Sequence, residues 1–402
     1  MHMKGAPILF ALVALAACGG ARGGSGAIPP GFGSSGLAAI DRGGSLGPVL
    51  STSDGGQIFG FDIDQNGNDG ILASTNGFEL SVQTFDQTSG QITRTFGVRK
   101  GHGARNGDDY VGDGIFAGDI ALIDHQVAGI PGQTAAKDEY LLVDPVTKMK
   151  LNGKWGIASK HFNTLQNAVN QSTTTSVVFG YERNGSDPSE LYVSDLAKHT
   201  SKVIKLNPQM FFLSMAPQLA QDTVNNLAVM ATSPSSGAAG GPPPVIATID
   251  LSSGKMTTFS GVACPGLVGC GYANGIAYDS ATGIACTTTE LDGGVEFYDV
   301  AKQTGSHVLM PNGGGQTFAG AYVVNDPVHQ LFLIAQPFSS TSPSGSSVQI
   351  YDESGTLEES INGLNFTDAG FLVIPVKIAI NPDKRIAWVN TSHANQLQEF
   401  SY

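Results

Sequence analysis

The most acidic short stretch of the chain is Asp62–Asp69, which reads DIDQNGND. Side-chain oxygens alternate along it at Asp62, Asp64 and Asn66, and alternating oxygen ligands are how loops wrap a hard cation such as calcium. Ala73, however, stands where a bidentate glutamate would close such a loop. The stretch also aligns with turns that recur along the chain. We therefore favour a plain hairpin turn, and calcium is the only cofactor that the sequence suggests.

The first residues predict an exported protein. An apolar run over 8–17 is long enough for the core of a signal peptide but too short to span a bilayer. It ends in Leu15-Ala16-Ala17-Cys18, which resembles a bacterial lipobox, in which the cysteine thiol takes the lipid. We expect Cys18 to be acylated, and ordinary cleavage after a small-residue site is the alternative. Gly19 in place of an aspartate favours sorting to the outer membrane.

Three further cysteines follow. Cys264 and Cys270 flank a short loop, PGLVG, and an extracytoplasmic compartment permits a disulfide between them. Two free thiols are the alternative. Cys286 lies in an apolar strand and is most simply a small buried hydrophobic residue. No histidine stands near the pair at the spacing that a zinc site needs, so zinc is disfavoured.

Two short patterns recur at about fifty residues, a period typical of propeller blades. The first is an apolar strand, a polar turn and a second apolar strand, clearest over 275–286. The second is an apolar strand that ends at an aspartate, as at Asp86, Asp250 and Asp352. Aspartate accepts N–H bonds from the residues after it and glycine supplies positive φ, so both patterns predict tight hairpins. Each unit therefore predicts four strands, which bury both faces by stacking around an axis.

The repeats predict an all-β propeller of seven four-stranded blades. Six or eight blades stay open as counts, because the second and third repeats are weak. The last repeat ends at Tyr402, one strand short of a blade. Gly47–Thr52 is similar to Ser306–Met310, the outermost strand of the fifth repeat. We expect this N-terminal strand to complete the last blade, which removes an exposed sheet edge.

The segment Ile378–Asn390 resembles a blade of the YVTN-repeat, lactonase-like propellers, in which a Pro-Asp turn precedes the signature strand. That family includes lactonases, cofactor-bearing dehydrogenase subunits and surface proteins, so the resemblance implies a fold rather than a chemistry. Asn274–Ala277 is similar to the stretch of the gluconolactonase family in which asparagine binds a catalytic metal. The resemblance implies a metal ligand at Asn274. The family's other ligands have no match here, so a cap at the entry to an inner strand is the favoured interpretation.

In a propeller, the loops that enter the inner strands share one face with those that join the second and third strands. Such a face is where propellers usually bind ligands, because loops vary freely over a rigid ring. The densest polar group there is 102–109, for which a solvated loop is the simpler interpretation. The candidates on this face are His102, Arg105, Asp108, Asp109, His161, Glu182, Arg183, Glu290, Gln316, Asp368 and His393.

Composition limits the partners and the domains. The chain has 21 Lys and Arg against 34 Asp and Glu, a net charge of −13, so it lacks the basic surface that binds nucleic acid. Membrane attachment would rest on the lipid alone. We divide the chain into a signal peptide over 1–17, a flexible tether rich in glycine and serine over 18–46, and the propeller over 47–402.

Three function classes remain. The favoured one is a non-catalytic binding or scaffold module at the periplasmic or outer surface, which engages an envelope protein or a small polar ligand through one face. The second is a metal-dependent, lactonase-like hydrolase with its site around Asn274 in the central channel. The third is an accessory subunit of a periplasmic redox enzyme. The chain has no Cys-x-x-Cys-His motif for haem attachment, so a cofactor would belong to the partner.

Overall fold

The structure is a computed structural model, and the described residues all lie in one compact unit, Ala39–Tyr402. The structure describes residues 44–65, 67–75, 79–100, 109–117, 120–127, 137–144, 149–150, 155–157, 162–170, 175–182, 190–195, 198, 200–206, 219–232, 243–263, 273–289, 293–311, 322–336, 346–364, 377–391, 393 and 395–402. The predicted division of the chain at residues 17 and 46 stays a prediction.

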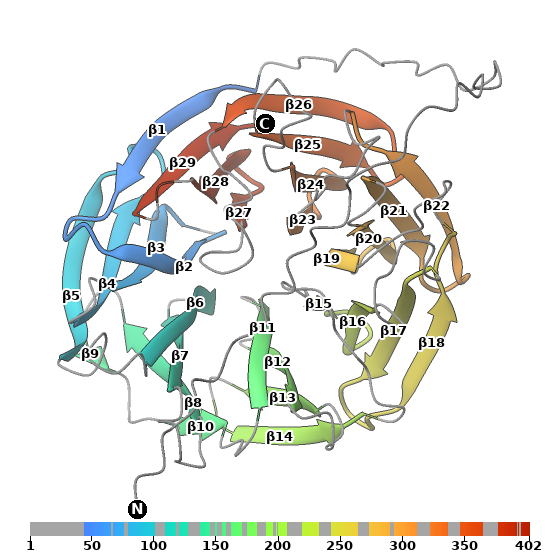
Figure 1. Cartoon of the computed structure of the whole chain (residues 1–402), viewed down its shortest axis with the longest axis horizontal. Coiled ribbons are helices and arrows are strands. Elements are labelled where there is room, and N and C mark those ends of the chain that lie inside the picture. The colour runs from blue at the N-terminus through green and yellow to red at the C-terminus, as the bar shows by residue number, and fades with distance from the viewer. Residues whose placement is uncertain are drawn as a thin grey trace, which may run out of the picture. The chain divides into compact units, whose positions relative to one another are not determined.

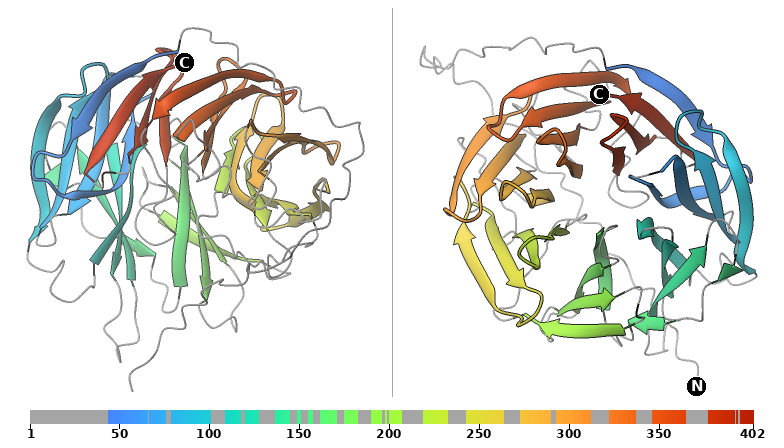
Figure 2. Two further views of the ribbon diagram at one scale, coloured as in Figure 1. Left: turned by 45° about the horizontal axis from the view of Figure 1, so that its top comes forward. Right: turned by 180° about the vertical axis from the view of Figure 1, so that it is seen from behind.

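Within the described residues, the strands form seven antiparallel sheets that stand as blades around a central axis (Figures 1 and 2). Blade 1 consists of β2 (Gln57–Ile63), β3 (Asp69–Thr75), β4 (Glu79–Asp86) and β5 (Ile92–Lys100). Blade 2 consists of β6 (Asp109–Ala117), β7 (Ile120–Val127), β8 (Lys137–Asp144), β9 (Met149–Lys150) and β10 (Trp155–Ile157). Blade 3 consists of β11 (Phe162–Asn170), β12 (Thr175–Glu182), β13 (Glu190–Asp195) and β14 (Thr200–Lys205).

Blades 4 to 6 follow the same inner-to-outer order. Blade 4 consists of β15 (Leu219–Asp222), β16 (Leu227–Thr232), β17 (Val245–Asp250) and β18 (Met256–Ser260). Blade 5 consists of β19 (Ala273–Asp279), β20 (Ile284–Thr289), β21 (Gly294–Asp299) and β22 (Thr304–Leu309). Blade 6 consists of β23 (Tyr322–Asp326), β24 (Leu331–Gln336), β25 (Ser346–Asp352) and β26 (Leu357–Leu364). Blade 7 consists of β27 (Ile378–Asn381), β28 (Ile386–Asn390), β29 (Gln396–Ser401) and β1 (Leu46–Ser51).

The prediction of seven four-stranded blades is wrong in its strand count, because only six of the sheets have four strands. Blade 2 has five, since two short strands share its outer edge. β9 pairs with Val143 and Asp144 near the end of β8, and β10 pairs with Asp138–Tyr140 near its start. The sequence between them contains Asn152-Gly153, a turn dipeptide that disfavours one continuous strand.

The N-terminal strand completes blade 7, as the sequence predicts. β1 pairs antiparallel with β29, and Leu50 lies opposite Leu397. Main-chain hydrogen bonds continue past both ends of the pair, from Ser401 N to Ser45 O at 2.8 Å and from Thr52 N to Asn395 O at 3.0 Å. Both ends of the folded unit therefore belong to one sheet, so no strand of blade 7 is left without its outer neighbour.

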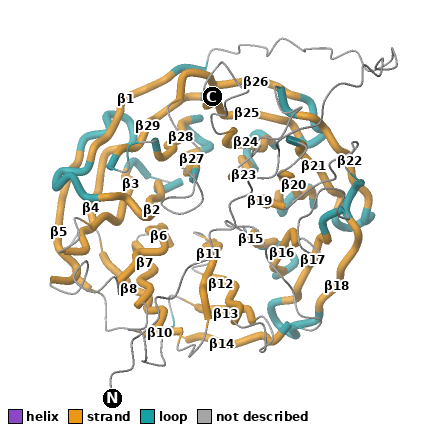
Figure 3. The backbone as a smooth tube through the Cα atoms, viewed as in Figure 1, coloured by secondary structure: helices purple, strands orange, loops and turns teal. Residues whose placement is uncertain are grey.

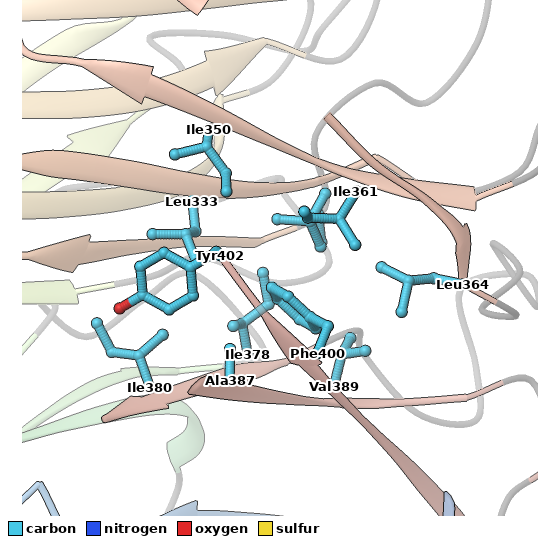
Figure 4. Packing of buried hydrophobic residues seen from close by; sticks show 12 residues of the cluster. Leu333, Ile350, Ile361, Leu364, Ile378, Ile380, Ala387, Val389, Phe400 and Tyr402 are labelled. Atoms are coloured by element: carbon cyan, nitrogen blue, oxygen red, sulfur yellow. The ribbon is translucent and has the colours of Figure 1, made fainter. Parts of the chain in front are cut away.

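The hydrophobic core is divided among the seams between neighbouring blades. One cluster joins blades 6 and 7, with Leu333 and Ile350 on one side and Ile378 and Phe400 on the other (Figure 4). Other clusters join blades 7 and 1, 3 and 4, 4 and 5, and 5 and 6. Because alternate residues of a strand point to opposite faces, the sheets of blades 4 to 7 each contribute to two of these seams. Each of these four blades therefore packs against both of its neighbours.

The turns that close the inner hairpins confirm the predicted aspartate chemistry. Asp222 Oδ1 accepts the N–H groups of the residues two and three positions on, each at 3.0 Å. Asp279 and Asp326 make the same pair of bonds. The last residue of the turn has positive φ, as at Asn226 (φ 56°) and Gly283 (φ 79°). Side-chain acceptors and left-handed residues thus close these turns locally.

Candidate functional site

The propeller has two unlike faces. On one, which we call the turn face, short turns join the first to the second strand of each blade and, in blades 1 to 6, the third to the fourth. The segments 64–68, 223–226 and 280–283 are examples. The described turns are drawn in teal in Figure 3. On the opposite face, the loop face, lie the second-to-third-strand connections and the crossovers, which we define as the segments that lead from the outer strand of one blade to the inner strand of the next. Connections there are as long as 206–218 and 233–244.

Of the residues that the sequence suggests for the loop face, three can be placed. Asp109 is the first residue of β6 and pairs with Val127, Glu182 is the last residue of β12, and His393 is exposed between β28 and β29. The following lie outside the described residues: His102, Arg105, Asp108, His161, Arg183, Glu290, Gln316, Asp368, and also Cys18, Cys264 and Cys270. Their roles stay predictions.

Asn274 lies inside β19 rather than ahead of it. Ala273 pairs with Thr289 and Gly275 pairs with Thr288, so Asn274 is the extra residue of a β-bulge. Asn274 is the second residue of β19, and the favoured interpretation, a cap at the entry to this inner strand, stays a prediction. Ala273 and Thr289 form the loop-face end of this strand pair, so Asn274 lies at that end of blade 5. A metal-binding role for Asn274 stays a prediction.

Side chains from blade 7 hold the main chain of the acidic stretch 62–69. Lys384 Nζ donates to Gly67 O at 2.7 Å and to Asn68 Oδ1 at 2.6 Å. Asn381 Nδ2 contacts Asp64 O at 3.2 Å. The stretch is therefore a hairpin turn between β2 and β3, as we favoured. Two of its oxygen atoms accept hydrogen bonds from the Lys384 ammonium group. The calcium role of Asp62, Asp64 and Asn66 stays a prediction, and Asn66 lies outside the described residues.

Cys286 is a free, fully buried thiol in β20, which confirms its interpretation as a core residue. Burial, with the nearby Glu296 carboxylate, raises its thiol pKa well above the ordinary value. Among the residues that can be described, no group of three or more His, Cys, Asp or Glu side chains is placed to hold a metal ion.

Buried side chains hold the crossovers on the loop face. The crossover 52–56 enters blade 1 and is bound by Gln83, which is fully buried in β4. Gln83 Oε1 accepts the N–H of Ser53 at 3.0 Å and its hydroxyl at 3.2 Å. Gln83 Nε2 donates to Asp54 Oδ1 and to Ser74 Oγ, both at 3.2 Å. One amide thus satisfies four polar groups and ties this crossover to the blade that it enters.

The crossovers into blades 6 and 7 are held in the same way. Gln336 Nε2, at the end of β24, donates to the carbonyl of Pro311 at 3.0 Å. Asn390 Oδ1, at the end of β28, accepts the N–H of Lys377 at 2.7 Å. Both anchoring side chains are buried. In each case the anchor belongs to the blade that the crossover enters, so the start of the inner strand is tied to its own sheet.

The crossover into blade 5 is held by a buried phenol. Tyr298 Oη accepts the N–H of Val262 at 3.0 Å and donates to the Glu296 carboxylate. Tyr298 and Glu296 are both buried. Burial first, and then the negative Glu296, raise the pKa of Tyr298, so the phenol keeps its proton and serves as donor and acceptor.

These four anchors are not among the candidates from the sequence. The signal that could have found two of them is a glutamine within an apolar strand, as Gln83 in SVQTF and Gln336 in LFLIAQ. A buried amide in such a strand needs a partner. That partner lies on a crossover, so only the folded chain identifies it.

Comparisons with known proteins show a fold and no family. No protein-family model and no curated protein matches the chain. Among solved structures, U3-55K is similar with a TM-score of 0.56 at 10% identity over 88% of this chain and 98% of that chain. The Cps50 (Swd1) β-propeller domain of Myceliophteria thermophila has a TM-score of 0.55 at 8% identity over 89% and 99%. Raptor from Chaetomium thermophilum has 0.54 at 12% identity over 88% of this chain and 28% of that one.

The RRP9 WD40 repeats are similar with a TM-score of 0.55 at 10% identity over 88% of this chain and 96% of that one. At such low identities, these four likenesses show the β-propeller fold alone. No helix in the described part of the chain is long and apolar enough to cross a membrane.

Proposed function

We propose that this chain is a lipid-anchored, non-catalytic binding module that holds a partner protein on its loop face. The observation that carries this proposal is the contrast between the two faces. On the turn face the aspartate turns are short and closed by their own side chains. On the loop face, a buried amide holds the short crossover 52–56. Two more buried amides and a phenol hold the crossovers 261–272, 310–321 and 365–377, which are more than twice as long as those turns.

A rigid ring that supports long connections is the arrangement that proteins use for recognition, because the connections can vary while the ring stays fixed. The buried side chains that anchor the crossovers contribute to affinity. Without them, the ends of each crossover would become ordered only when the partner binds, and the entropic cost of that ordering would weaken the affinity. The anchored crossovers therefore reduce the entropic cost of holding a partner.

The sequences of two loop-face connections favour a protein partner over a small polar ligand. The segment 207–218 reads NPQMFFLSMAPQ and has no charged residue, and 365–376 reads NFTDAGFLVIPV and has one, Asp368. Aromatic residues and methionine are enriched at the centres of protein interfaces, whereas charged residues are depleted there. The polar run 102–109 would then belong to the rim.

The proposed location of the module in the cell rests on the first residues of the chain. The lipobox-like Leu15–Cys18 and the Gly- and Ser-rich segment after it support a lipid anchor on a flexible tether, at the outer membrane and outside the cytoplasm. The likeness of Ile378–Asn390 to the YVTN-repeat blade belongs with this proposal. Its Pro382-Asp383 turn joins β27 to β28, and Arg385 N donates to Pro382 O at 3.2 Å.

Site-specific photo-crosslinking in cells tests the binding face. A photo-reactive amino acid replaces the exposed His393 on the loop face, and the matched control replaces Val224, which is 70% exposed on the turn face. We expect a discrete protein adduct from position 393 and none from 224. The adducted protein, once identified and purified, should bind the chain at least tenfold more weakly when 102–109 is replaced by Gly-Ser repeats, and with unchanged affinity for V224D. Equal labelling at both positions would refute the loop face.

Fractionation tests the anchor separately. Cys18→Ser should remove fatty-acid labelling and move the chain from the membrane to the soluble fraction, whereas Cys264→Ser should leave both unchanged. If C18S stays membrane-bound, the lipid anchor is wrong, even if the crosslinking result stands.

A further inference from the structure

The residue directly after the third strand of a blade reaches the preceding blade at the turn face; we call this the seam position. Tyr402 occupies it in blade 7, and its hydroxyl donates to Asp326 Oδ2 of blade 6 at 2.9 Å. Gln87 occupies it in blade 1, and its Oε1 accepts from Asn381 Nδ2 of blade 7 at 2.9 Å. In both seams a hydrogen-bond donor meets an acceptor, and each contact ends on the last residue of an inner strand.

In blade 6 the seam position is Glu353, and the residue that it meets in blade 5 is also an acid, Asp279. The two carboxyl groups are close enough for the charge of Asp279 to act on Glu353, and both contact the same residue, Thr282. Glu353 Oε1 accepts the Thr282 hydroxyl at 2.6 Å, and Asp279 Oδ1 accepts the N–H groups of Ala281 at 2.7 Å and Thr282 at 3.3 Å. Both acids therefore converge on one turn.

Asp279 is fully buried, and its second oxygen, Oδ2, has no hydrogen-bond partner among the described residues. An acceptor that is buried without a donor destabilises the folded chain. Glu353 could supply the missing donor only as a neutral carboxylic acid, because an ionised carboxylate has no hydrogen to donate. A neutral glutamic acid has the shape and the donor of a glutamine, the residue at the seam position of blade 1.

We propose that Asp279 and Glu353 share one proton and form a pH-sensitive latch, which joins blades 5 and 6 while the proton is bound and weakens that seam when both acids are ionised. The O–H of the neutral acid donates to the other carboxylate, as in other close carboxyl pairs. The latch acts on the ring itself and does not depend on a partner protein.

The surroundings favour retention of the proton. Burial is the first cause that raises the pKa of Glu353 above its ordinary value of 4.5, and the negative charges of Asp279 and Asp352 add to it, while the hydrogen bond from Thr282 acts in the opposite direction. The phenol of Tyr278 lies near both Asp279 and Asp299. The positive charge beside this group is Lys302, whose Nζ pairs with Asp299 Oδ2 at 2.7 Å.

The sign of the pH effect follows from linkage. The pKa of Glu353 is higher in the folded chain than in the unfolded one, so over that interval the folded state binds more protons. Stability then falls as pH rises from about 4.5 through the raised pKa of Glu353. Two ionised carboxylates in one seam repel each other above that pKa.

The first test compares thermal melts of the full chain and of Glu353→Gln from pH 4.5 to 8. At pH 4.5 the two should melt together, because the neutral acid and the amide are equivalent. At pH 8 E353Q should have the higher melting temperature, since its amide still donates to Asp279. A difference between the two that is constant across this range would overturn the proposal.

Two further variants isolate the shared proton. Asp279→Asn leaves an amide facing the single acid Glu353, so no proton is shared between two acids, and it should remove the same pH dependence. Tyr402→Phe lowers stability in the neighbouring seam and should do so equally at pH 4.5 and pH 8. Infrared spectra across the same pH range should show a carboxyl group that keeps its proton above pH 4.5, the ordinary pKa of glutamate, and that E353Q lacks. If magnesium or calcium chloride at pH 8 raises the melting temperature of the wild type alone, the pair binds a metal ion and the shared proton is refuted.

Discussion

Removing the hydroxyl of Tyr402 should weaken the seam between blades 6 and 7 without disturbing its apolar packing. The side chain is 6% exposed, and its ring lies in the cluster of Figure 4, with the Arg385 guanidinium 5.4 Å from the ring centre. Burial and the nearby Asp326 raise the pKa of Tyr402, so the phenol remains a donor. Tyr402→Phe leaves these packing contacts in place and deletes only the bond to Asp326.

The expected loss of stability depends on the hydrogen bonds that Asp326 retains in Tyr402→Phe. Hydrogen bonds to buried charged groups contribute about 1.5–3 kcal/mol. Asp326 is fully buried, but it retains His329 Nδ1 at 2.8 Å and the N–H groups of Val328 and His329 at 2.9 and 3.1 Å. The loss should therefore lie in the lower half of that range, at about 2 kcal/mol. Urea denaturation followed by circular dichroism measures it.

Tyr351→Phe is the matched control. Tyr351 is fully buried in the third strand of blade 6, and its hydroxyl has no hydrogen-bond partner in the described part of the chain. Removing an unpaired buried hydroxyl should leave stability unchanged or raise it by about 1 kcal/mol. If Y402F and Y351F shift the urea midpoint equally, the bond between Tyr402 and Asp326 does not stabilise the seam and the reasoning fails.

Two further predictions concern the contact between blades 7 and 1 and the loop-face anchors. A Cβ at Gly90 (φ 68°) would lie 2.9 Å from Trp388, whereas one at Gly55 (φ 67°) would meet nothing within 4 Å. Gly55→Ala should therefore lower the free energy of unfolding only by the strain of a left-handed alanine, about 1–2 kcal/mol. Gly90→Ala should lower it by about 1–3 kcal/mol more, as measured by thermal or urea unfolding. Equal losses of stability in the two variants would exclude the steric contact with Trp388. Gln83→Ala should speed amide exchange of Ser53 by about tenfold or more, because its N–H loses a buried acceptor, and unchanged exchange would refute the anchor.

Much of the fold could be predicted from the sequence because its signals are local. Asp222, Asp279 and Asp326 each bond to N–H groups two and three residues on, so turn residue and acceptor lie within one hairpin. The closing strand at 46–51 was also found, since it resembles other outer strands. The split edge of blade 2 was missed, although Asn152-Gly153 is a turn signal.

The candidate site was harder to predict. Polar residues on connections, such as His393, are visible in the sequence, but the groups that hold those connections are not. Gln336 in an apolar strand signals only that its amide needs a partner, and Asn390 carries no such signal; each binds a crossover that precedes its own inner strand. Which amide meets which carbonyl depends on the placement of a crossover beside a blade, and no local pattern encodes that placement.

The sequence by itself determined the repeat, the hairpins and the turn chemistry, because each depends on residues a few positions apart. Only the tertiary structure decided which side chains meet across the seams. Tyr402 and Asp326 are 76 residues apart, and Thr282 and Glu353 are 71 apart. Closing the ring brings such pairs together, and the close contact then decides whether a donor meets an acceptor or one acid meets another.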